Sequence, residues 1–255
     1  MTGFEALWPQ NISPNRLAIL ERKLLLWLRS QDLQTETPSV GGPYQSVEEL
    51  QALTQKAAAE GCNFSELQGT VRAVVDANTD NFLELAELAG LNPASDFAGA
   101  RLLGTHLSNS DFSGANLRKA YLRGVDLSDA DLSGADLREA NLSGADLSGA
   151  LLSDANLGGA NLHRASLALA NLSGADLSRV NLSEANLSNC NLSDADLSGA
   201  SLKNADLHQA GLALTNLAGA DLTGAVVKQA RLWHDAGLSE EVKQDLIRRG
   251  AIFEP

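Results

Sequence analysis

The side chains that could carry out chemistry in this chain are few and widely separated. Four histidines and two cysteines are present: His106, His163, His208, His234, Cys62 and Cys190. A zinc site or a disulfide framework requires such residues in close groups, for example as Cys-x-x-Cys, and no group of this kind occurs. We therefore predict no metal, no cofactor and two free thiols in a reducing compartment.

Catalytic motifs are equally absent from the sequence. There is no phosphate-binding Gly-rich loop, no His-Glu-x-x-His pair and no Gly-x-Ser-x-Gly turn for a nucleophilic serine. Aspartate is frequent, but it stands mostly one position before a leucine, as in Ala145 to Gly149, which is a structural pattern. These observations predict a protein that is not an enzyme and has no catalytic or cofactor-binding residues.

Overall charge limits the partners that the protein can have. The 255 residues carry a formal net charge of −13, with an isoelectric point near 4.6. Such a chain is repelled by nucleic acid and by anionic membranes, so we expect neither as a direct partner. A protein with a basic surface fits better. Met1 to Gln10 lacks a secretory pattern and the run Leu24 to Leu28 is too short to span a bilayer, so we predict a cytoplasmic protein without membrane insertion.

The stretch that must position any functional residue runs from 95 to 232. A large apolar residue recurs there at every fifth position, from Phe97 to Leu232, and the residue two positions earlier is small. A period of five fits neither a helix nor a strand, so the chain must turn a corner in each unit. Turns of about 90° close a square coil every 20 residues, and coils stack at about 4.8 Å through backbone hydrogen bonds.

This pattern resembles the pentapeptide-repeat family, whose members form a right-handed quadrilateral β-helix. The resemblance implies a mainly β fold of about seven coils, a rod about 30–35 Å long. The central residues of the repeats would fill its interior, including Phe97, Leu102, Phe112, Leu132, Leu152, Leu172, Leu192 and Leu212. Cys190 stands where the repeat has a small residue, so we expect it to be buried. The phrase from Phe82 to Phe97 and the tail from Leu246 to Phe253 resemble flanking segments in cyanobacterial members.

Residues 1–94 follow a helical pattern and are predicted to form a small all-α domain. Ser13 before Pro14 starts the first helix, Ser46 with Glu49 starts the second and Gly61 ends it. A third helix is expected from about Glu66 to Ala77. A fourth is expected from about Asp80 to Ala89, with Thr79 as its cap and Gly90 as its end. The segment from Gln31 to Gln45 is expected to be flexible.

Residues 233–255 are predicted to form a capping helix and tail. The helix would start at Ser239 and pack through Trp233, Ile252 and Phe253. The N-terminal helices either cap the first coil or recruit a partner, and the sequence is compatible with both functions.

Folding the charges onto the four sides of the predicted coil reveals an acidic surface on the two adjacent sides that contain Leu107 and Phe112. The acidic surface comprises Asp111, Asp126, Asp129, Asp131, Asp146, Asp154, Asp194 and Asp206. The only cations on these sides are Lys228 and Arg231, at the far end, whereas the other two sides mix both signs. We interpret the acidic surface as a binding face for a protein, with solubility alone as the alternative explanation.

Two leucines, Leu151 and Leu169, are expected to point outward near the middle of the acidic surface, about one coil apart. They form either a small binding hot spot or ordinary exposed apolar residues.

The resemblance also implies a second function, because some family members mimic DNA and inhibit DNA gyrase. Eight carboxylates over five coil steps give about one charge per 3 Å, against one per about 1.7 Å in duplex DNA, which argues against mimicry. The pattern favours no particular oligomeric state.

Overall fold

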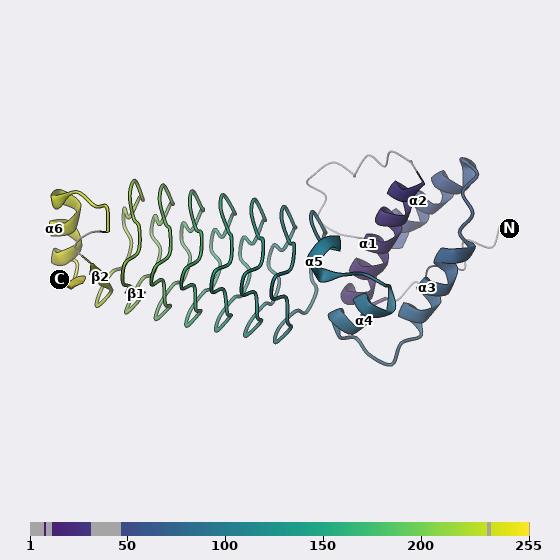
Figure 1. Ribbon diagram of the computed structural model, residues 1–255, viewed down its shortest axis with the longest axis horizontal. Helices are drawn as coiled ribbons and strands as arrows, with labels where there is room; N and C mark the ends of the chain where they lie inside the picture. Colours follow the sequence, from purple (N-terminus) through teal and green to yellow (C-terminus); the bar gives the residue numbers. More distant parts are fainter. Residues whose placement is uncertain (1–7, 9–11, 32–46, 234–235, 255) are drawn as a thin grey trace.

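A computed structural model of the chain describes residues 8, 12–31, 47–233 and 236–254. A long rod of stacked coils lies between a group of helices, α1 to α5 (within residues 14–96), at one end and helix α6 (Glu240–Arg248) at the other (Figure 1). The predicted flexible segment, Ser46 and His234 lie outside the described residues. No helix in the part of the chain that the structure describes is long and apolar enough to cross a membrane.

The predicted start of the first helix and the predicted end of the second are confirmed. Helix α1 spans Pro14–Ser30, and the Ser13 hydroxyl accepts a hydrogen bond from the Arg16 amide, which confirms the predicted cap. Helix α2 spans Val47–Ala59. It ends at Gly61, whose φ of 87° lies in the left-handed region that glycine favours, so this end is also confirmed.

Helix α3 spans Ser65–Val75 and helix α4 spans Phe82–Leu88. The prediction of Thr79 as the cap of the fourth helix is wrong. The cap is Asn81, whose side chain accepts from two amides of the first turn, and the Thr79 hydroxyl instead accepts from the Asn81 amide. A short helix α5, Pro93–Asp96, was not predicted and leads into the first coil.

The rod has the predicted coil of 20 residues. Every isolated bridge in the rod joins two residues 20 apart in parallel, as in His106 with Asp126 and Asp126 with Asp146. Each pentad turns a corner through a hydrogen bond such as the 3.1 Å contact from the Ala150 amide to the Leu147 carbonyl. The third residue of that turn, Gly149, has a φ of 71°, which is typical of a type II turn.

One hydrophobic core runs through the whole molecule. The eight central residues named for the sequence pattern are each at most 1% exposed, and the same core continues into the helices at both ends. Phe82 of α4 joins the two parts, since its ring centroid lies 5.4 Å from Phe97 and 6.0 Å from Phe112. The helices therefore cover the hydrophobic core of the first coil as well as packing on one another.

Cys190 lies in this core in place of an alanine and is 2% exposed. Desolvation raises the pKa of its thiol to about 12, so almost no thiolate forms at neutral pH. In a Cys62→Ser variant, we expect no modification of Cys190 by Ellman's reagent in native buffer and rapid modification in denaturant. Native-state labelling as fast as in denaturant would contradict this placement.

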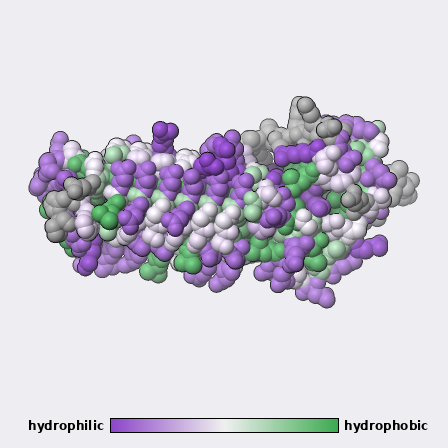
Figure 2. Space-filling model, in the orientation of Figure 1, coloured by the Kyte–Doolittle hydropathy of each residue, from purple (hydrophilic) through white to green (hydrophobic). Residues whose placement is uncertain are grey.

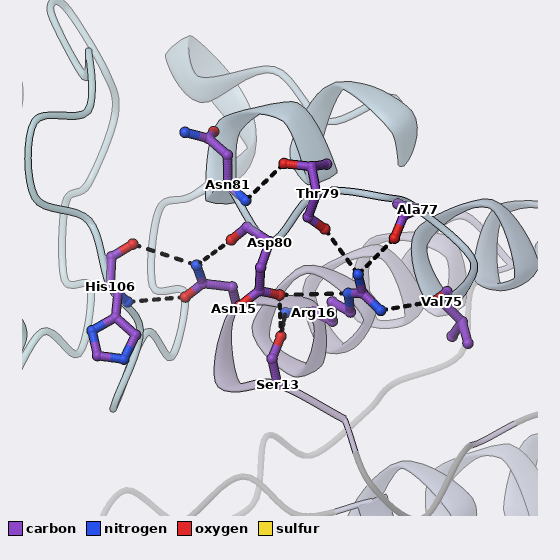
Figure 3. A network of polar contacts seen from close by, with 9 residues as sticks. All are labelled: Ser13, Asn15, Arg16, Val75, Ala77, Thr79, Asp80, Asn81 and His106. Carbon is purple, nitrogen blue, oxygen red and sulfur yellow. Dashed lines mark hydrogen bonds and ion pairs between the residues drawn. The ribbon is translucent and has the colours of Figure 1, made fainter.

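The N-terminal edge of the rod is covered by the start of α1 (Figure 3). Asn15, only 3% exposed, accepts from the His106 amide at 2.9 Å and donates to the His106 carbonyl at 3.4 Å, and it also donates to the Asp80 carbonyl at 2.7 Å. Its amide thereby takes the place of the coil that would precede His106. Next to it, the Arg16 guanidinium donates to the carbonyls of Val75, Ala77 and Thr79.

The C-terminal edge is closed by strands and by a second side chain. Strands β1 (Gly211–Leu212), β2 (Arg231–Trp233) and β3 (Ile252–Glu254) pair in parallel and in that order. Helix α6, Glu240–Arg248, is capped by Ser239 as predicted and buries Leu246. On another side, the Arg249 guanidinium lies 3.3 to 3.4 Å from the carbonyls of Leu222 and Ala225.

One predicted packing residue of this end points outward. Ile252 is 44% exposed, because it pairs with the outward residue Arg231, while Phe253 pairs with the inward Leu232. The expectation for Ile252 was wrong because the register of β3 on β2 is not visible in the sequence. This register determines which side chains of β3 face the core and which face outward.

Candidate interaction surface

The acidic surface occupies two adjacent sides of the rod and is built from two kinds of position. Five of its members come directly before a central leucine or phenylalanine: Asp111, Asp126, Asp131, Asp146 and Asp206. The other three lie at the corners of the coil, with φ values of 55° to 60°: Asp129, Asp154 and Asp194. All eight are exposed or partly exposed. Bridges stack Asp126 beneath Asp146 and Asp111 beneath Asp131, so the carboxylates form columns along the rod.

Aspartates that come directly before the central residue also stabilise the backbone turn through a side-chain hydrogen bond. The Asp126 carboxylate accepts from the Ser128 amide at 3.0 Å, and those of Asp131 and Asp146 accept in the same way at 2.9 and 3.0 Å. Asparagines make the same bond elsewhere in the rod, as between Asn141 and the Ser143 amide. These are Asx-turns, and they require a side-chain oxygen at this position.

Two of the corner aspartates depend instead on glycine in the next coil. A side-chain carbon at Gly149 would lie 2.3 Å from an Asp129 carboxylate oxygen, and one at Gly174 would lie 2.4 Å from Asp154. Each carboxylate therefore occupies the space that the glycine leaves free. At these two corners, a side chain in the next coil would collide with the carboxylate, whereas Asp194 is followed one coil later by Leu214.

Hydrogen bonding keeps two members of the acidic surface ionised. The Ser113 hydroxyl and amide lower the pKa of Asp111 below its ordinary value of 3.8, and Ser128 lowers the pKa of Asp126 in the same way. Both contacts favour the charged form of the carboxylate. These two charges are thus fully present at neutral pH.

Ion pairs are distributed unequally around the rod. On the other two sides, arginines and lysines lie 2.6 to 3.4 Å from Asp136, Glu139, Glu184 and Asp221. Among the described residues, no member of the acidic surface has an ion-pair partner. The charge of these eight side chains is therefore not neutralised by the part of the chain that the structure describes.

Apolar residues interrupt the acidic surface at its middle. Leu169 is 70% exposed and Leu151 is 45% exposed, and Leu151 forms a bridge with Asn171, two residues from Leu169. Leu169 also has a φ of 64°, as does Leu214 at 56°, and a leucine is strained in this region. In the view of Figure 2, most of the rod is hydrophilic, with small hydrophobic spots along it and a larger hydrophobic area near the helices.

Strain at Leu169 leads to a prediction about stability. Asn189 occupies the equivalent corner one coil further on, with a φ of 58°, because asparagine tolerates this conformation. We expect Leu169→Asn to raise the free energy of unfolding by about 0.5–1 kcal/mol, as measured by denaturant titration. Leu88→Asn, at an exposed helical leucine, should give no gain. A loss of stability in the first variant would contradict the strain argument.

The three histidines that the structure describes are not brought together. His106 and His208 lie on the same side of the rod but five coils apart, about 24 Å at the usual strand spacing. The Nδ1 atom of His163 lies 2.9 Å from the Ser183 carbonyl on a different side. Within the described ranges, no three His, Cys, Asp or Glu side chains are grouped in a way that could hold a metal ion.

A groove at the junction of the helices and the rod was not predicted. Its lining includes Leu83 and Glu87 of α4, Leu91 and Pro93 after it, and Asp111 of the first coil. These residues lie between positions 83 and 111 and come from two different parts of the fold, the helical segment and the first coil. The groove forms only because α4 and α5 pack against the first coil, so the sequence contains no signal for it.

Comparison with known proteins identifies the repeat. The family model for pentapeptide repeats matches eight copies over residues 94–129, 130–168, 170–209 and 200–232, more than half of the chain. A comparison with curated proteins finds no match.

Among solved structures, a pentapeptide repeat protein of the Arabidopsis thaliana thylakoid lumen is 30% identical, over 51% of this chain and 81% of that chain, with a TM-score of 0.34. Rfr23 from the cyanobacterium Cyanothece 51142 is 38% identical, over 37% and 62%, with a TM-score of 0.29. QnrB1, a plasmid-mediated fluoroquinolone resistance protein, is 20% identical, over 62% and 91%, with a TM-score of 0.41.

All three TM-scores lie below 0.5, so assignment to a family depends on the repeat match. That match covers the entire series of stacked coils, and the family fold is a right-handed β-helix. The chain belongs to the pentapeptide-repeat family.

Proposed function

We propose that this protein is a non-enzymatic scaffold that binds a partner protein through the acidic surface of its β-helix. The observation that carries the proposal is the segregation of charge. Four carboxylates on the other two sides of the rod are paired with arginine or lysine, whereas none of the eight on the acidic surface has an ion-pair partner within the described residues. A partner with a basic surface would supply the missing cations.

The exposed leucines Leu169 and Leu151, of which Leu169 is strained, support the same face. Neither solubility nor folding favours Leu169, which exposes an apolar side chain in a backbone conformation that costs about 1 kcal/mol. Strain of this kind is often retained where a residue has a function. Together with Leu151, it would place an apolar contact inside a rim of carboxylates, as in many binding hot spots.

The Asx-turns decide how the proposal must be tested. Reversal of Asp126, Asp131 or Asp146 to lysine would remove a backbone acceptor together with the charge, so a loss of binding could reflect damage to the turn. Asparagine keeps the acceptor and removes only the charge. The informative variant is therefore Asp126→Asn, Asp129→Asn, Asp131→Asn and Asp146→Asn, in which the formal net charge changes from −13 to −9.

A matched control exists on the other two sides. Asp136, Asp176, Asp196 and Asp221 each accept a turn hydrogen bond, so their replacement by asparagine changes the net charge equally and also preserves the turns. We expect the acidic-surface variant to lose the partner retained by wild-type protein in affinity purification from source-cell extract. The control variant should retain it. Equal retention or equal loss by both variants would argue against the acidic surface.

Mimicry of DNA is the alternative function, and the wild-type protein and the acidic-surface variant can also test it. Charge density is against it, since the acidic surface has about half the linear charge of duplex DNA and Leu169 interrupts it. We expect purified DNA gyrase to supercoil DNA at an unchanged rate when the protein is added. Inhibition by wild-type protein that disappears in the acidic-surface variant would favour mimicry.

A further inference from the structure

The junction groove combines an apolar lining with two carboxylates. Leu83, Leu91 and Pro93 supply apolar surface, and Glu87 and Asp111 supply negative charge. Asp111 is also the first member of the acidic surface along the chain, so the groove adjoins the column of carboxylates that Asp111 forms with Asp131. A ligand that lies in the groove would thus meet both apolar contact and negative charge.

Asp111 also presents an open backbone edge. In its parallel bridge with Asp131, the Asp131 amide donates to Ser110 and the Asp131 carbonyl accepts from Phe112. This pattern directs the amide and carbonyl of Asp111 itself to the opposite side, where a preceding coil would lie. Neither group has a hydrogen-bond partner among the residues that the structure describes.

The neighbouring side of the same coil shows what such an edge accepts. His106 stands in the equivalent position, and there the side-chain amide of Asn15 both donates to its carbonyl and accepts from its amide. The edge is thus complementary to one amide group, which Asn15 provides at His106 and which the described chain does not provide at Asp111. A peptide backbone carries the same group.

We propose that the junction groove binds an extended basic segment of a partner protein, which adds a strand to the open edge at Asp111. One residue of the segment would exchange both backbone hydrogen bonds with Asp111. Because side chains alternate along a strand, apolar residues would contact Leu83, Leu91 and Pro93 while lysine or arginine faces Glu87 and Asp111. The proposal rests on the proposed function, since it describes how a basic partner of the acidic surface is anchored.

A helical ligand is a poorer fit to this site. Within a helix the amide and carbonyl of a residue bond along the helix, and at its ends only one of the two is free, so no residue of a helix can exchange both hydrogen bonds with Asp111. Exchange of the Asp111 amide with solvent therefore distinguishes an added strand from any ligand held by charge alone.

The probe is a fluorescein-labelled heptapeptide of alternating lysine and valine, and the protein is the full chain. We expect binding by fluorescence anisotropy, and slowing of Asp111 amide exchange by about tenfold or more in NMR when the peptide is bound. Glu87→Gln with Asp111→Asn should weaken binding about fivefold, while the Asx bond of residue 111 is kept. Glu84→Gln with Asp136→Asn, outside the groove, should bind like wild type.

Failure of this inference is separable from failure of the proposed function. The variant with asparagine at 126, 129, 131 and 146 leaves the groove intact and should bind the peptide within about twofold of wild type. Absence of peptide binding, or binding without protection of the Asp111 amide, would overturn the groove proposal. Peptide binding lost only in the variant with asparagine at 126, 129, 131 and 146 would also overturn it, yet would support the acidic surface.

Discussion

Replacement of Leu152 by alanine is expected to lower the free energy of unfolding by about 2–5 kcal/mol. Leu152 is 0% exposed at the middle of the rod, and its backbone is held in the stack by a 2.7 Å bond from its amide to the Asn171 carbonyl. Truncation leaves a cavity that the coils above and below cannot fill, because their hydrogen bonds fix the spacing. Denaturant titration followed by circular dichroism measures the effect.

The adjacent residue provides the control for this experiment. Leu151 has the same side chain but is 45% exposed, so Leu151→Ala should change the free energy of unfolding by no more than about 0.5 kcal/mol. Similar losses in the two variants would mean that burial within the coil does not determine stability.

Asn15→Leu is expected to cost about 2–4 kcal/mol and to promote association of the rods. The substitution removes the partners of the His106 amide and carbonyl and of the Asp80 carbonyl, in a site where Asn15 is 3% exposed. An unpaired edge of stacked coils is a template for pairing with another chain. Thermal unfolding measures the loss of stability, and light scattering measures the association.

The control for this variant carries the same substitution nearby. Asn78 is exposed in the segment between α3 and α4, and no hydrogen bond of its side chain is present within the described structure. Asn78→Leu should therefore leave both stability and association close to wild type. If Asn15→Leu were equally harmless, sealing of the edge by Asn15 would have no energetic value.

Much of the fold could be predicted because the repeat is local. A leucine at every fifth position requires a corner in each unit, and the unbroken phase from Phe97 to Leu232 fixes which residues share a side of the coil. Caps such as Ser13 and Ser239 were visible for the same reason, since the bonds they make span three residues. Thr79 was mistaken for a cap because Asn81, a residue equally suited to capping, follows closely.

Contacts between distant segments could not be predicted in this way. Asn15 lies 91 residues from His106, and Arg249 lies 27 from Leu222, so nothing near either side chain indicates that it closes an end of the rod. The eight acidic residues could be assigned to adjacent sides from their phase alone. That their carboxylates lack ion pairs, while Asp136 and Glu184 have them, depends on side-chain positions that only the structure provides.

The constant separation of 20 residues between bridged positions has a consequence for insertions and deletions. Adding or removing 20 residues changes the length of the rod by about 4.8 Å and leaves every downstream column in line. Adding or removing five residues rotates everything downstream by a quarter turn, so Asp194 and Asp206 would move to a neighbouring side. The length of the rod and the angular position of its side chains can therefore change independently. A partner that binds both sides of the acidic surface would tolerate a change in length but not a rotation of the downstream coils.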